Sequence, residues 1–107
     1  MNLNRKTLTA FKIKADPRVK NDLKQAKEFL KSRRVGLDKQ FLIDYRSNLK
    51  SLQINPFFHI RYDNIGCLPF DVFKYMIHFS IDEQNNIVMV HAVISTYLDP
   101  KENWLYS

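Results

Sequence analysis

Hydrophobic and polar side chains alternate near the N-terminus of the chain. In the segment TAFKIKA, residues 9–15, apolar side chains alternate with Lys12 and Lys14. A period of two is typical of a strand that buries one face, because successive side chains point to opposite faces. The pattern therefore predicts a first strand over residues 9–15, with both lysines on the same exposed face.

A helical pattern begins directly after this strand. Asp16 is suited to cap a helix, since its carboxylate can accept backbone N–H groups of the first turn, and Pro17 fits the first helical position. Apolar residues then recur at helical spacing, which predicts a helix from residue 17 to about residue 34. The apolar stripe consists of Val19, Leu23, Ala26 and Leu30, widened by Phe29.

A second helix is predicted after Gly36. Glycine can adopt the left-handed conformation that ends a helix, and the next apolar stripe begins at once. Asn55-Pro56 ends this second helix, because the residue before proline avoids the helical region. The short connection predicts two antiparallel neighbours, a helical hairpin. The second stripe consists of Leu37, Phe41, Leu42, Tyr45, Leu49 and Leu52.

The remainder of the chain has the composition of strands. Ile, Val, Tyr and Phe are frequent, and short polar segments separate the apolar runs. DEQNN, residues 82–86, reads as a hairpin loop. The predicted elements are a strand over 57–62, a turn at Asn64-Ile65-Gly66, a short strand segment over 67–70, and two long strands over 75–81 and 87–96.

These elements predict one α+β domain that spans residues 1–107. The order is β-α-α-β-β-β, in which an antiparallel helical hairpin buries its two apolar stripes against one largely antiparallel sheet. The length of 107 residues suits a single domain with one modest core. The sequence contains no repeat, linker or low-complexity segment.

Basic residues are concentrated in the first half of the chain. Residues 1–50 carry 14 Lys or Arg and 5 Asp or Glu, a net charge of +9, whereas residues 51–107 carry 3 and 6, a net charge of −3. Five cations recur along the first helix at spacings of 4, 3, 4 and 3. They form either a solvated helix face or a docking ridge for an acidic partner. These residues are Lys20, Lys24, Lys27, Lys31 and Arg34.

The order of short motifs along residues 9–104 resembles the RelE/ParE superfamily of toxins. DPRVKNDLKQAKEFL is similar to the first helix of that family, and the segment after residue 50 is similar to its second half. The motifs that carry the resemblance are Leu52 with Asn55-Pro56, Arg61-Tyr62, Leu68-Pro69, Tyr75 to Phe79, Ala92-Val93-Ile94, Asp99-Pro100 and Trp104.

The resemblance implies the toxin of a type II toxin–antitoxin system, a bacterial cytoplasmic protein that arrests growth or stabilises a plasmid. Its partner would be an antitoxin with an acidic segment. ParE-like action, interference with DNA gyrase by protein contact, is the preferred interpretation. The alternatives are a RelE-like ribosome-dependent mRNA endoribonuclease and a degenerate, non-toxic module that still binds the antitoxin.

Two departures from the family favour a protein without catalytic residues. Relatives often carry basic residues where this chain has Asp71 and Val72, and a His and an Arg where it has Ser95 and Leu98. RNA cleavage needs a base, an acid and cations that stabilise the phosphate. If the chain is a ribonuclease, the candidates for these roles are Arg61, Lys74, His78, His91 and Tyr97.

The alternation in the last two strands predicts which side chains face away from the helices. Inward-facing Ile77 and Phe79 place His78 on the other face, directly opposite His91. Each histidine is otherwise an ordinary sheet residue. An apolar patch of Met76, Met89 and Val93, with Ile87, is expected on the same face, covered by the partner or by a C-terminal segment with Trp104 and Tyr106. The predicted partner-binding residues are Lys12, Lys14, Lys20, Lys24, Lys27, Lys31, Met76, Met89 and Val93.

Other classes of site find little support in the sequence. Cys67 is the only cysteine, which excludes an internal disulfide and indicates a small core residue in a reducing compartment. No His or Cys pattern has the spacing of a metal site. We expect no cofactor, no small-molecule ligand and no membrane-spanning segment.

Overall fold

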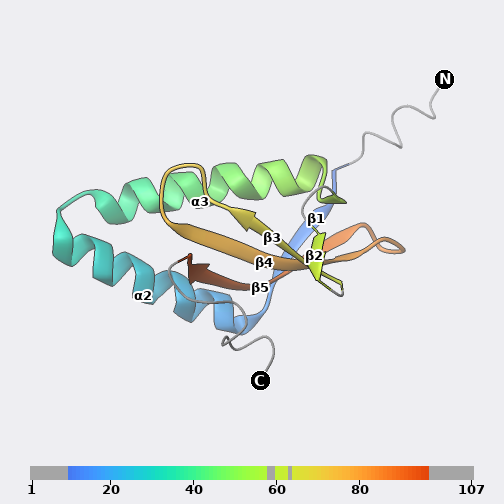
Figure 1. Cartoon of the computed structure of the whole chain (residues 1–107), viewed down its shortest axis with the longest axis horizontal. Helices are drawn as coiled ribbons and strands as arrows, with labels where there is room; N and C mark the ends of the chain where they lie inside the picture. The colour runs from blue at the N-terminus through green and yellow to red at the C-terminus, as the bar shows by residue number, and fades with distance from the viewer. Residues whose placement is uncertain (1–9, 58–59, 63, 97–107) are drawn as a thin grey trace.

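The computed structural model describes residues 10–57, 60–62 and 64–96 of the chain. In this part of the chain two helices and five strands follow one another in the order β1-α2-α3-β2-β3-β4-β5 (Figure 1). The elements are β1 (Lys12–Ala15), α2 (Pro17–Arg33), α3 (Leu37–Ile54), β2 (Ile60–Tyr62), β3 (Ile65–Pro69), β4 (Tyr75–Asp82) and β5 (Ile87–Ser95).

The sheet confirms the predicted α+β fold class and adds one parallel pair. The strand order is β1-β5-β4-β3-β2, and every neighbouring pair is antiparallel except β1 and β5. The helical hairpin carries the chain from β1 across to the other edge of the sheet. The first strand can therefore run parallel to the last one, beside it in space although far from it in sequence.

Both helices begin and end where the sequence predicts. The Asp16 carboxylate accepts the backbone N–H of Arg18 at 2.9 Å, and Pro17 opens α2. Gly36 has a φ of 97°, a left-handed conformation that glycine adopts without strain, and α3 begins at the next residue. Figure 1 shows the resulting helical hairpin, closed by this turn.

Gly66 has a different role from the one predicted. It belongs to β3 rather than to a turn, so the predicted turn at Asn64-Ile65-Gly66 is wrong beyond Asn64. The strand predicted from Phe57 begins at Ile60. Gly66 lies opposite Phe79, and a Cβ at Gly66 would come within 2.8 Å of three Phe79 ring carbons. The glycine therefore makes room for an aromatic ring of the core.

The core fills the layer between the helical hairpin and the sheet. Phe41 of α3 is fully buried at its centre, with its ring 5.0 Å from that of Tyr75, 5.2 Å from that of Phe70 and 5.7 Å from that of Phe73. These aromatic contacts fix α3 over β4 and the loop before it. The other buried members include Val19, Leu30, Leu52, Ile77, Phe79, Val88, Val90 and Val93.

A β-bulge at His91 changes the orientation of the last strand. His78 pairs with Ala92, whereas the next residue, Phe79, pairs with Val90, so that His91 is an extra residue in β5. Directly paired residues share a face of the sheet. The predicted pairing of His78 with His91 is therefore wrong, because the bulge places Ala92 opposite His78.

The same bulge reverses the predicted orientation of Val93. Val88 and Val90 face the helices before the bulge, as expected, but after it Val93 pairs with the core residue Ile77. Val93 is only 3% exposed and belongs to the core. It therefore does not contribute to an outward apolar patch.

Candidate functional site

The face of the sheet that points away from the helices carries polar pairs on neighbouring strands. On β3 and β4, Cys67 Sγ lies 3.5 Å from His78 Nδ1. On β4 and β5, Ser80 Oγ and His91 Nε2 form a hydrogen bond of 2.8 Å. Cys67 and His78 are buried, and Ser80 and His91 are partly buried. The cross-strand contact to Ser80 satisfies one ring nitrogen of His91.

Burial lowers the pKa of both sheet histidines. Burial, together with smaller contributions from the positive charge of Arg18 and from protonated His91, lowers the pKa of His78 to about 4. Burial also lowers the pKa of His91, an effect that the Asp16 carboxylate partly opposes. A neutral imidazole contributes no positive charge to a phosphate site, so His78 is poorly suited to act as a general acid near pH 7.

Two cations that a ribonuclease site on this sheet could use, Lys14 and Lys74, lie far apart along it. Lys14 pairs with Met89, which pairs in turn with Ser80, so this lysine lies level with the middle of β4. Lys74 precedes β4 and is six residues from Ser80, roughly 20 Å along an extended strand. Arg61 belongs to β2, but its side chain lies outside the described part of the structure, as does the whole of Tyr97.

The basic ridge on α2 is present as an exposed helix face. Lys20, Lys24, Lys31 and Arg34 are exposed and Lys27 is half-buried. A shallow hollow of about 250 Å³ beside this face is lined by Lys24, Lys27 and Lys31 together with the acidic residues Glu28 and Asp38. Among the described residues, none of the ridge lysines forms an ion pair; the pair Arg18–Asp22, at 3.5 Å, lies beside the ridge. The ridge is therefore available to an external acidic group.

The predicted apolar patch is smaller than expected. Met76, Met89 and Ile87 are half-buried on the face away from the helices. Val93, which was predicted to belong to the patch, lies in the core instead. Lys12 and Lys14 are exposed at the edge strand β1. The predicted cover by Trp104 and Tyr106 lies outside the described residues. A role of Met76, Met89 and the lysines in partner binding stays a prediction.

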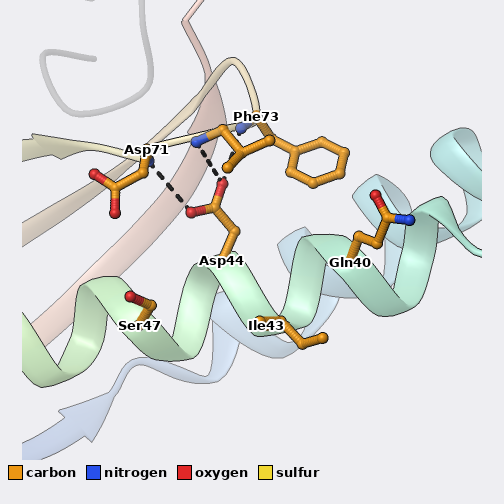
Figure 2. Close-up of a pocket in the computed structure, with 7 residues that line it drawn as sticks. Gln40, Ile43, Asp44, Ser47, Asp71 and Phe73 are labelled. Carbon is orange, nitrogen blue, oxygen red and sulfur yellow. Dashed lines mark hydrogen bonds between the residues drawn. The ribbon is translucent and has the colours of Figure 1, made fainter.

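Sequence reasoning missed a polar anchor on α3. Asp44 is 5% exposed, and its carboxylate accepts backbone N–H groups of Asp71 at 3.3 Å, Val72 at 2.9 Å and Phe73 at 2.8 Å (Figure 2). Asn48 donates to the same carboxylate at 3.1 Å. The signal was present in the sequence, because Asp44 and Asn48 have the helical spacing of the buried stripe. Polar residues at buried positions need partners.

Neither described helix combines the length and the apolar character needed to cross a membrane. Within the described ranges, no three His, Cys, Asp or Glu side chains are grouped in a way that could hold a metal ion.

Comparison with known proteins identifies the fold. No protein-family description matches the sequence, and no curated protein matches it. A solved structure, a chain of the chromosomal ParDE toxin–antitoxin system from P. aeruginosa, superposes with a TM-score of 0.69 over 81% of this chain and 97% of that one. The two chains share a fold. Their sequences are 10% identical, so the likeness concerns architecture and leaves function to be argued from the surface.

Proposed function

We propose that this protein is the toxin of a type II toxin–antitoxin system and that it acts in the ParE manner, by protein contact with DNA gyrase. The observation that carries the proposal is the shared fold with a ParDE chain, matched over nearly the whole of that chain. On this proposal an antitoxin with an acidic segment neutralises the protein, and the basic ridge of α2 contributes to its binding.

The arrangement of titratable groups supports contact rather than catalysis. A ribonuclease on this sheet would need cations beside the phosphate and a protonated acid. In the described residues the two sheet histidines have lowered pKa values, and Lys74 lies far from Lys14 along the sheet. Antitoxin and gyrase would instead be recognised by shape, apolar contact and charge.

Two assays on the purified full chain test this function together. In the first, gyrase supercoiling of a relaxed plasmid is measured with increasing protein; inhibition or trapped cleaved DNA is expected. In the second, mRNA 5′ ends are mapped after incubation with purified ribosomes; no new ends are expected. New cuts in the ribosomal A site that disappear in Arg61→Ala or His91→Ala would replace the gyrase proposal with the ribonuclease. If neither target is affected, the non-toxic binding module becomes the better account.

A further inference from the structure

Helix α3 and the loop between β3 and β4 enclose a groove that the proposed function does not use. Its volume is about 300 Å³. It is lined by Gln40, Ile43, Asp44 and Ser47 of α3 and by Asp71, Val72 and Phe73 of the loop (Figure 2). The loop occupies the position after Leu68-Pro69, where the sequence departs from its resemblance to the RelE/ParE toxins.

The loop wall of this groove is held rigidly. Asp44 binds three successive backbone N–H groups of the loop, at residues 71–73. Phe70 donates its backbone N–H to the carbonyl of Tyr75 at 2.8 Å, and the Phe73 ring packs edge-on against Phe41. Because its backbone and one aromatic side chain are fixed, the loop cannot turn its remaining apolar side chain into the core.

Two large apolar side chains remain exposed at the groove. Ile43 is 64% exposed on the helix wall and Val72 is 72% exposed on the loop wall. Single exposed apolar residues are common on protein surfaces. This pair differs, since the two side chains line one concave site and the clamped loop keeps Val72 in place. The arrangement resembles a prepared docking site more than a chance exposure.

On the helix side the rim of the groove carries exposed cations, whereas the charged residues that line the groove itself are Asp44 and Asp71. Lys39 and Arg46 lie four residues before and three after Ile43, which places them on the same helix face, and Lys50 follows Ser47 by three residues. All three cations are exposed, as is Lys74 on the loop, whereas Asp71 is the exposed acid of the loop. A partner with acidic flanks suits this rim. A second copy of the chain, with a net charge of +6, would be repelled.

The loop backbone also restricts the form of the partner. A β-strand would need free backbone N–H groups to pair with, but those of residues 71–73 already bind Asp44. A helix needs none, because it docks through side chains spaced along one face. The groove therefore suits a helix whose apolar side chains enter between Ile43 and Val72.

We infer that the groove between α3 and residues 71–73 binds an amphipathic helix with acidic flanks from the partner protein. The inference rests on the proposed function, since it names where an antitoxin would bind. It adds to the basic ridge of α2 a second contact, on the side of α3 that faces the β3–β4 loop.

The test uses the immobilised full chain and a displayed library of helical peptides in which acidic, basic and neutral flanks are equally represented. We expect selection to enrich acidic peptides with apolar residues along one face. Ile43→Ala and Val72→Ala should each weaken the enriched peptides by about tenfold or more, as truncation of a central contact does. Val35→Ala is the matched control: Val35 is 87% exposed outside the groove, and affinity should be unchanged.

Several results would overturn the inference. These are an absence of enriched peptides, enrichment of basic or neutral flanks, or equal affinity of the Ile43→Ala, Val72→Ala and Val35→Ala variants. Sedimentation equilibrium that shows a dimer broken by Val72→Ala would assign the groove to a second copy instead. None of these measurements involves gyrase or the ribosome. If gyrase is unaffected but the peptides bind, the proposed function alone is rejected. If gyrase is inhibited but no peptide binds, the proposal of a helix-binding groove alone is rejected.

Discussion

The Asp22 carboxylate on α2 accepts the backbone N–H of Val93 on β5 at 3.0 Å, across 71 residues of sequence. Strand β1 pairs with β5 only from Ile87 to Val90. Beyond that point the edge of β5 has no neighbouring strand among the described residues. An unpaired edge N–H is costly when buried and invites pairing with other chains. Beyond the end of β1, the Asp22 carboxylate therefore accepts a backbone N–H group that a neighbouring strand would otherwise bind.

Removal of this carboxylate should destabilise the protein. Asp22→Ala leaves the partly buried Val93 N–H without its acceptor, so we expect the free energy of unfolding to fall by about 1–3 kcal/mol. Asp22→Asn keeps an acceptor oxygen and should lose less. Urea unfolding measures both, and amide hydrogen exchange of Val93 should accelerate in Asp22→Ala. The control is Glu28→Ala at an exposed position of the same helix. Unchanged exchange at Val93 would contradict the assignment.

The loop anchor Asp44 should matter more than a typical acidic residue. Asp44→Ala removes the acceptor of three backbone N–H groups, and we expect a loss of about 2 kcal/mol or more in unfolding free energy. Asp71→Ala changes an exposed side chain and leaves its backbone N–H in place, so it should cost less than about 0.5 kcal/mol. Equal losses in the two variants, measured by thermal or urea unfolding, would show that the loop does not depend on Asp44.

His78 should make the protein less stable in mild acid. Its pKa is about 4 in the folded protein against 6.5 for the free side chain, so the unfolded chain binds a proton first as the pH falls. Above pH 6.5 both states are neutral and the group contributes nothing. Between about pH 6.5 and about pH 4, unfolding becomes progressively easier, by about 2 kcal/mol after allowance for solvent screening.

The measurement is urea unfolding at a series of pH values for the native chain and His78→Gln. The variant should show a shallower decline in this pH window, because Gln does not titrate. His91 has a pKa lowered in the same direction and remains in both proteins, so some decline should persist. Parallel pH profiles for the two proteins would mean that His78 is not the group responsible.

Leu30 and Phe29 provide a matched pair of neighbours on α2. Leu30 is 9% exposed and belongs to the core, so Leu30→Ala should cost about 2–5 kcal/mol as a cavity-forming change. Phe29 was predicted to widen the same stripe, but it is 51% exposed, with the Arg33 guanidinium 4.9 Å from its ring centre. Phe29→Ala should cost less than about 1 kcal/mol. Similar losses in urea unfolding would show that the stripe is assigned wrongly.

The sequence by itself determined most of the local structure. The capping pair Asp16-Pro17, the left-handed turn at Gly36 and the stop at Asn55-Pro56 set the helix bounds, because each acts through its own backbone or its nearest neighbours. The runs of β-branched and aromatic residues similarly fixed β4 and β5. From these elements the α+β fold class followed.

Only the tertiary structure decided the orientation of the last strand and the position of the site. Met89 and Val93 are similar apolar residues in one apolar run. Because of a single bulge at His91, Val93 lies in the core and Met89 lies on the opposite face of the sheet. A bulge depends on the register of the neighbouring strand, which no local pattern encodes. The partners of Asp22 and Asp44 are likewise 71 and 27–29 residues away, so these contacts exist only once the chain has folded.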